Sequence, residues 1–138
     1  MKKPTVQKLK KELDKVFSLY IRQRDNFICF TCGLRGNKRN IQNGHFVPRQ
    51  YNATRYDERN CNAQCFADNM FYNGQPTEYA LRLQEKYGDG IVKELNDLRK
   101  KIKQFTVQEL QSMIELYKSK IKGTEALVGA SEKSDIQI

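Results

Sequence analysis

Two short cysteine clusters decide the fold: residues 29–33 read CFTCG, and residues 60–69 read NCNAQCFADN. The first is a zinc knuckle, in which two thiolates grip one edge of an ion and the glycine permits a tight turn. The second supplies Cys65 as a third ligand. No apolar signal core follows the basic N-terminus, so we expect the reducing cytoplasm, where cysteines are more often metal ligands than disulfides. These clusters predict a structural Zn²⁺ site.

The fourth zinc ligand has two candidates. Asp68 stands in the Cys-x-x-Cys position relative to Cys65, and a carboxylate is an acceptable zinc ligand. Cys61 lies four residues before Cys65 and needs a different backbone path. The spacing favours Asp68, with Cys61 as the alternative. A third arrangement leaves Cys61 buried and free, and completes a three-cysteine site with water.

The chain is strongly basic for its length. Its 138 residues, 38% of them apolar, are enough for one domain, and 25 Lys and Arg against 16 Asp and Glu give a net charge of +9. This excess favours a polyanionic partner. Residues 1–24 hold eight basic side chains against two acidic ones, which a solvated helix face explains equally well. Residues 35–55 hold five basic side chains and no acid, which favours phosphate binding.

The N-terminal half shows one helical and two strand-like patterns. Residues 5–25 carry an apolar stripe at three- and four-residue steps, which predicts a helix. Residues 27–30 and 41–46 are short apolar runs separated by a turn-like stretch, and we interpret them as a hairpin with Cys29 and Cys32 near its bend. Residues 47–58 read as a surface loop, and residues 60–72 as the start of a short helix. The stripe comprises Leu9, Leu13, Val16, Phe17, Tyr20 and Ile21.

The C-terminal half is predicted to be helical over residues 77–87, 90–104 and 106–121, with Thr77 and Thr106 as N-caps. The last helix is expected to pack against the one before it as a helical hairpin. The organisation we expect is a basic helix over 1–25, a zinc-bound core over 26–76, a helical extension over 77–122 and a flexible tail over 123–138.

His45 is the only histidine, and it lies at the end of the second predicted strand. A lone histidine is more often structural than catalytic. Here it sits in the acid-free basic loop, where phosphate would gather and a neutral imidazole could act as general base near pH 7.

A family resemblance rests on these residues. The order His45, Asn60 and Asn69 resembles the His-Asn-His/Asn order of HNH nucleases. Residues from about 13 to 98 resemble more closely the phage NinG (Rap) recombination endonucleases. The segments that carry this resemblance are residues 17–25 (FSLYIRQRD), CFTCG, Gly44-His45-Phe46 with Arg49, residues 60–65 (NCNAQC), Asn69, Gly74 and Tyr79.

The resemblance implies an α+β fold: a zinc-stabilised ββα-metal (HNH-like) core with an N-terminal helix and a C-terminal helical extension. It implies that His45 activates the attacking water, that Asn60 fixes the loop orienting it, and that Asn69 ligates a catalytic Mg²⁺ or Mn²⁺. The substrate class it implies is branched DNA such as Holliday junctions. Flanking phosphates are expected to be held by basic side chains of the two zones, namely Arg22, Arg24, Arg49 and Arg55.

Three departures from the family pattern keep alternatives open. Asp68 replaces the family's fourth cysteine, Asn62 stands where relatives often carry histidine, and Gly44 offers no side chain where many HNH enzymes have an aspartate ligand. Side-chain ligands for a catalytic ion are therefore sparse. The rival hypothesis is a zinc-stabilised, non-catalytic nucleic-acid-binding recombination accessory that stacks bases on aromatic side chains, namely Phe46, Tyr51 and Tyr56.

Three expectations concern partners and location. An adaptor that uses the apolar stripe of residues 107–121 as a partner surface ranks last, because such stripes are usually internal core. Junction resolution needs two symmetric cuts, which favours a homodimer through the terminal helices. No run approaches the roughly 20 apolar residues of a membrane span, so we expect no membrane partner and a cytoplasmic protein, in the host cell if it is phage-encoded.

Overall fold

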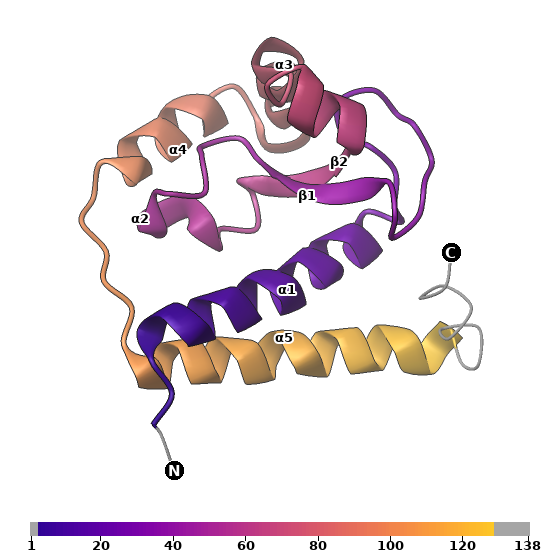
Figure 1. The fold of residues 1–138 in the computed structure, drawn as a ribbon. Helices are drawn as coiled ribbons and strands as arrows, with labels where there is room; N and C mark the ends of the chain where they lie inside the picture. Colours follow the sequence, from indigo (N-terminus) through magenta and orange to yellow (C-terminus); the bar gives the residue numbers. More distant parts are fainter. Residues whose placement is uncertain (1–2, 129–138) are drawn as a thin grey trace.

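The molecule combines helices with a two-stranded sheet, as the predicted α+β class requires. The computed structural model describes residues 3–128, and side chains for residues 3–121. The layers run from α5 through α1 to the sheet, with α3 and α4 on the opposite side (Figure 1). The elements in chain order are α1 (Val6–Arg24), β1 (Ile41–His45), α2 (Asn52–Arg55), β2 (Cys61–Cys65), the π-helix η1 (Ala67–Phe71), α3 (Pro76–Tyr87), α4 (Ile91–Arg99) and α5 (Val107–Val128).

The N-terminal helix forms as its apolar stripe predicts. Thr5 is the N-cap, since its side chain accepts a hydrogen bond from the backbone N–H of Lys8 at 3.2 Å. The stripe faces inward, and its buried side chains pack against α5 and Cys61 at the start of β2. Four side chains of this face are buried: Leu9, Leu13, Phe17 and Ile21. This interface forms the largest core cluster and places the polar flank of α1 beside β1.

The predicted hairpin between residues 27–30 and 41–46 is wrong. β1 pairs antiparallel with β2, with His45 opposite Cys61 and Ile41 opposite Cys65, whereas Ile28 makes only an isolated bridge to Arg35. The predicted helix start at residue 60 is wrong too, because residues 61–65 are a strand and helical structure begins only at η1. Apolar and polar residues alternate along β2, but all five are buried, so the alternating exposure of a half-exposed strand is missing.

The C-terminal helices differ in partner from the prediction. α5 packs on α1, not on α4, so the predicted helical hairpin is wrong; α4 lies against α2 and α3. α4 ends at Arg99, and Ile102 is 95% exposed. The stripe of α5 is core, which removes it as a partner surface; its buried side chains are Leu110, Ile114, Tyr117 and Ile121.

Several boundaries of the helices differ from those predicted. Thr106 caps α5 as predicted, because its hydroxyl accepts from the N–H of Glu109 at 3.0 Å. α3 begins at Pro76 after Gln75, not at a Thr77 cap, since proline is favoured in the first helical turn. The loop over 47–58 contains α2. α5 continues past residue 123 to Val128, and residues 129–138 of the predicted tail lie outside the described residues.

Among the described residues, no helix has the length and apolar character needed to cross a membrane.

The contact between α1 and α5 predicts a matched pair of stability effects. Leu110 is fully buried and Leu116 is 50% exposed on the same helix. Leu110→Ala should lower the free energy of unfolding by about 2–5 kcal/mol, because it leaves a cavity in the core. Leu116→Ala should change it by less than about 0.5 kcal/mol. Urea unfolding of both variants measures this, and equal effects would contradict the assignment of the α5 face.

Candidate metal centre and basic cleft

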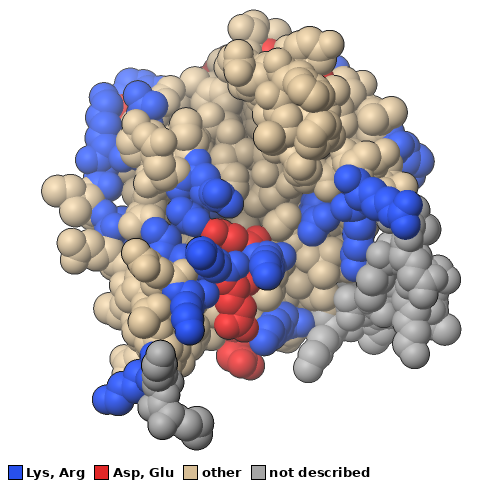
Figure 2. All heavy atoms as spheres, viewed as in Figure 1, with Lys and Arg blue, Asp and Glu red and all other residues tan. Residues whose placement is uncertain are grey.

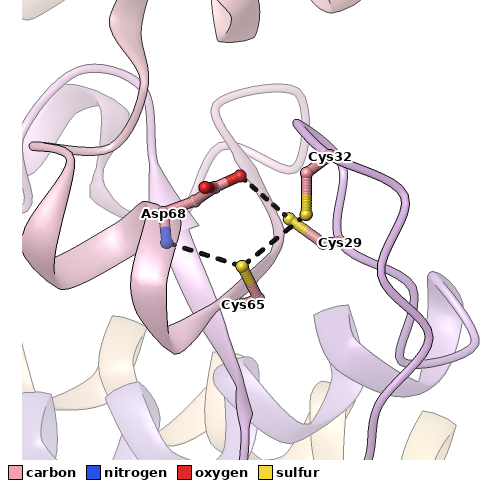
Figure 3. A group of neighbouring side chains, drawn as sticks. All are labelled: Cys29, Cys32, Cys65 and Asp68. Atoms are coloured by element: carbon pink, nitrogen blue, oxygen red, sulfur yellow. Dashed lines mark hydrogen bonds between the residues drawn. The ribbon is translucent and has the colours of Figure 1, made fainter.

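Four side chains from two distant segments meet beside the sheet. The ligand atoms of Cys29, Cys32, Cys65 and Asp68 all lie within 4.8 Å of one another. The sulfurs of Cys32 and Cys65 are 3.7 Å apart, and Cys29 Sγ lies 3.6 Å from Asp68 Oδ2 (Figure 3). A tetrahedral zinc with bonds of about 2.3 Å separates its ligands by about 3.8 Å. The cluster therefore has the size and donor set of a zinc site.

Local backbone geometry presents these ligands. Gly33 adopts a φ of +81° and donates its N–H to Cys29 O at 2.9 Å, which closes the knuckle that carries Cys29 and Cys32. Cys65 ends β2, and Asp68 follows within η1 with its N–H donating to Cys65 Sγ at 3.4 Å. One ligand pair thus comes from a turn and the other from a strand-to-helix junction (Figure 3).

The electrostatics of the cluster favour a bound cation. Burial, with the neighbouring thiols of Cys29 and Cys65 adding to it, raises the pKa of Cys32 to about 12. Burial acts to raise the pKa of Asp68 as well, but the hydroxyl of Thr31, which donates to Oδ2 at 2.7 Å, and other hydrogen bonds hold this pKa below its usual value. A divalent ion would bind the cysteines as thiolates, and its charge would offset the repulsion among those thiolates and the Asp68 carboxylate.

Cys61 is not a ligand in this arrangement, so Asp68 rather than Cys61 completes the cluster. Cys61 is fully buried in the core between α1 and α5, where its thiol donates to Arg55 O at 3.4 Å. Four residues of extended chain separate it from Cys65 by about 13 Å. Burial also raises the pKa of Cys61 well above its usual value, as expected of an inert core thiol.

A separate cleft of about 810 Å³ lies between the polar flank of α1, β1 and η1. Two of the residues predicted as catalytic, His45 and Asn69, line it. In Figure 2, Lys and Arg side chains flank a hollowed surface, with a small group of acidic side chains below it. The charged side chains that line the cleft are Asp14, Arg22, Lys38, Arg39 and Arg49. Four cations against one carboxylate make the cleft a candidate phosphate-binding surface.

His45 is held in one orientation at the cleft. Its Nε2 lies 3.0 Å from the carbonyl oxygen of Arg55, which can only accept a hydrogen bond, so Nε2 carries the proton and Nδ1 keeps its lone pair. Burial, the largest cause, and the nearby Arg49 lower its pKa to about 4. The imidazole is therefore neutral at physiological pH, with one nitrogen available as a base.

The two predicted asparagines have different surroundings. Asn60 is fully buried and brackets the loop after β1: its Oδ1 accepts from Val47 N–H at 2.7 Å and its Nδ2 donates to Val47 O at 3.0 Å and Thr54 O at 3.2 Å. It lies outside the cleft lining. Asn69 reaches the cleft from η1, and its Nδ2 donates to Gln42 Oε1 at 2.7 Å, which leaves its Oδ1 as an acceptor.

The predicted arginines divide into two pairs. Arg22 and Arg49 line the cleft. Arg22 donates to Ser18 O at 3.1 Å and to Lys38 O and Ile41 O at 3.4 Å, but it forms no ion pair with any described residue. Arg49 Nη1 lies 3.9 Å from Asp14 Oδ2. Arg24 and Arg55 are committed to structure. Arg24 binds Asp25 and Cys61 O, and Arg55 forms a two-pronged pair with Asp14. The structure does not bring these last two to the cleft.

The sequence analysis did not predict that Asp14 belongs to the site, where it is the single carboxylate in the cleft lining. It accepts from Arg55 and from the hydroxyl of Tyr56 at 2.8 Å. A signal was present, because Asp14, Ser18 and Arg22 follow at four-residue steps and so share one polar face of α1.

Gly44 owes its missing side chain to packing. A Cβ there would lie 2.0 Å from Oε1 of Gln64, whose side chain crosses over it. The carbonyl of Gly44 accepts from the hydroxyl of Tyr79 at 2.6 Å, and that hydroxyl accepts from Asn62 Nδ2 at 3.1 Å. Gly44 and Asn62, two of the departures noted in the sequence, thus belong to a buried polar network around Tyr79.

Comparison with known proteins gives one family. The family model described as Bacteriophage Lambda NinG protein matches residues 1–126 of this chain. No curated protein and no solved structure matches it.

The cluster geometry predicts which cysteine matters for zinc. Cys65→Ala should lose the bound zinc and lower the melting temperature, because three ligands hold the ion less well and the metal contributes folding free energy. Cys61→Ala, which removes an equally buried thiol outside the cluster, should retain zinc. Elemental analysis of both purified variants measures the metal content. Equal zinc loss in the two would contradict this ligand set.

The burial of His45 predicts a pH effect of defined sign. In the unfolded chain its pKa is near 6.5, and in the folded protein it is about 4. As pH falls from 6.5 to 4, the unfolded chain takes up a proton that the folded protein excludes, so this contribution to stability is lost across that window. Above pH 6.5 it is constant. ¹⁵N NMR titration should give a midpoint well below 6.5, and unfolding of His45→Gln should show a weaker pH dependence over the window. A midpoint at or above 6.5 would disprove the burial argument.

Proposed function

Since this chain belongs to the bacteriophage lambda NinG family, we propose that it is a metal-dependent DNA endonuclease that cuts branched DNA such as Holliday junctions. Family membership indicates a function in phage recombination. The endonuclease activity and the branched substrate are our proposal, and they rest on the contents of the cleft.

The observation that carries this proposal is the state of His45. The carbonyl of Arg55 fixes the proton on Nε2, so the lone pair of Nδ1 is the basic site of the ring. A neutral imidazole in a cationic cleft can take a proton from a water molecule that attacks phosphorus. A pKa near 4 makes the free protein a weak base, but an anionic phosphate bound nearby would raise that pKa toward the working range.

The cationic lining supports a phosphodiester as the ligand. Arg22 has no carboxylate partner among the described residues, and Arg49 is 3.9 Å from its one acidic neighbour, so both can pair with phosphate oxygens. Arg22 donates to the backbone carbonyls of Ser18, Lys38 and Ile41, and these contacts restrict its side chain before a ligand binds. Asn60 acts on the same site indirectly, because it fixes the loop that follows His45.

The cleft would hold a divalent cation only together with the substrate, because its own side chains offer too few ligands. Among the described residues, the single group of three or more His, Cys, Asp or Glu that could hold an ion is the Cys29–Asp68 cluster, which lies outside the cleft lining. Asn69 Oδ1 is the protein atom that would hold Mg²⁺ or Mn²⁺ there, with substrate phosphate oxygens as further ligands. When bound, such an ion supplies Lewis-acid stabilisation of charge on the phosphate. In this proposal β1, β2 and η1 form a ββα-metal core.

The sparse ligand set favours a second candidate function. Asp14, the cleft carboxylate, is already paired with Arg55, so no charged side chain is ready to hold a catalytic ion. A zinc-stabilised, non-catalytic nucleic-acid-binding accessory protein of recombination would need only the cationic cleft and the metal cluster. The two candidates differ in the activity expected of the protein: an endonuclease cuts DNA and loses this cutting with His45, whereas the accessory protein binds DNA and does not cut it.

The test is cleavage of a labelled four-way junction, a linear duplex and single-stranded DNA with added Mg²⁺ or Mn²⁺, or with EDTA. His45→Gln should reduce cutting by at least about 100-fold, because it loses the base, while its amide can still donate to Arg55 O. DNA affinity, zinc content and melting temperature should stay near those of the unmodified protein. Lys93→Ala, which removes an exposed cation outside the cleft, serves as the control.

Metal-dependent cutting that persists in His45→Gln would reject His45 as the base. Tight DNA binding without cutting under every metal condition would favour the accessory protein.

A further inference from the structure

The segment around η1 exposes apolar side chains beside the cationic cleft. Phe66, Met70, Phe71 and Tyr72 are 43%, 56%, 71% and 59% exposed. We call these four residues the apolar apex. The rings of Phe66 and Phe71 pack edge to face with centroids 5.4 Å apart, so part of the apex is a preformed aromatic surface. Exposure of this much aromatic and thioether surface in one short segment marks an interaction site.

The apex is anchored from below by the metal cluster. Cys65 directly precedes Phe66, and Asp68 lies in η1 between Phe66 and Met70. A metal bound by these two ligands and by Cys29 and Cys32 would tie the backbone of the apex to the knuckle. At the far end, Gln64 Nε2 donates to Gly74 O at 2.9 Å and to Thr31 Oγ1 at 3.0 Å. A π-helical turn is rare, and it occurs often at functional sites. The apolar side chains are therefore held out to solvent by a fixed backbone.

The charge of the segment separates it from its surroundings. Asp68 is the only charged residue between positions 66 and 75, and it is 6% exposed because it points into the metal cluster. The apex itself presents no charge, whereas the adjoining cleft is lined by Arg22, Lys38 and Arg49. Met70 belongs to both surfaces, since it is an apex residue that also lines the cleft.

A partner that fits both the cationic cleft and the apolar apex must carry anionic groups and flat apolar groups close to one another. Nucleic acid has this chemistry, with phosphates on the backbone and π-faces on the bases. In an intact duplex the bases are stacked on one another, and their faces are closed to a side chain. They open where stacking is broken, at a branch point, a bubble or a single strand. An apolar protein partner would cover the apex but leave the adjacent cations without a counterpart.

We infer that the apolar apex stacks on unstacked bases of the DNA whose phosphates lie in the cationic cleft, and that this contact makes the protein selective for DNA with interrupted base stacking. The inference rests on the proposed function, because it takes DNA as the cleft's ligand. The apex then provides the selectivity for unstacked DNA, and the cations of the cleft provide most of the affinity for its phosphates. Stacking does not depend on base identity, so the selectivity is for DNA structure and not for sequence.

The experiment compares a four-way junction, a duplex with an unpaired bubble and a linear duplex of equal length, without added Mg²⁺ or Mn²⁺. The variant is Phe71→Ala with Tyr72→Ala, which changes two apex residues that lie outside the cleft lining. The control is Leu81→Ala with Leu116→Ala, which removes two side chains that are each 50% exposed and lie outside the cleft lining. Zinc content and melting temperature are measured first for each protein.

We expect the apex variant to lose at least about fivefold in affinity for the junction and the bubble, with little change for the linear duplex. The control should bind all three probes as the unmodified protein does. A second measurement needs no variant: 5-iodouracil placed at the branch point should crosslink, on irradiation, to the segment 66–72 of the unmodified protein.

Three results would overturn the inference. Equal weakening on all probes would make the apex a general contact. Unchanged affinities together with crosslinks outside 66–72 would remove it from the DNA interface, and a change of oligomeric mass in the apex variant would make it a protein interface. These outcomes leave the cleavage test of His45 standing, whereas an unmodified protein that binds no probe overturns the inference and the proposed function together.

Discussion

The convergence of Cys29, Cys32, Cys65 and Asp68 is the constraint on which the rest of the structure depends. The sheet has only two strands of five residues, and so small a sheet is marginal without further support. A metal held by this cluster would join the knuckle to the end of β2, across a sequence separation of 33 positions from Cys32 to Cys65. It fixes the start of η1 at the same time. The position of Asn69 in the cleft thus follows from the ligands that precede it.

A second constraint is the buried polar layer behind β1. β2 carries two amide side chains into the interior, those of Asn62 and Gln64, and the NH₂ group of each donates to specific partners. Asn62 donates to Tyr79, and Gln64 donates to Thr31 and Gly74. Buried polar groups of this kind fix one arrangement, since any other leaves them unpaired. The layer holds β1 in place, and with it the backbone that ends at His45.

The cleft sets two demands against each other. The proposed reaction needs a neutral His45 as the base, and burial keeps the imidazole neutral but also makes it a weaker base. The surrounding cations add to that effect until an anion arrives. A phosphate bound as proposed would offset the cations that lower the pKa of the imidazole. The pairing of Asp14 with Arg55 would reduce the repulsion between this carboxylate and such a phosphate.

The sequence determined the local features whose cause lies within a few residues. Helix α1 and its buried stripe, the Thr106 cap, the knuckle at residues 29–33 and the choice of Asp68 all followed from spacing and residue type. The predicted resemblance to the NinG family was confirmed as well, since the family model matches residues 1–126. These features depend on short-range geometry, in which 3.6-residue periodicity or ligand spacing leaves few alternatives.

Only the tertiary structure decided which elements pair. The stripes of α1, α4 and α5 are similar in apolar character, so the sequence could not show that α5 packs on α1 rather than on α4. β2 is buried on both faces, its two amide side chains included, and its pairing with β1 is a long-range contact that the sequence does not show. Arg24 and Arg55 look like phosphate ligands in the chain, but acids distant in sequence or backbone carbonyls claim them. Long-range contacts of this kind leave no periodic trace, because each partner is chosen by the packing of the whole molecule.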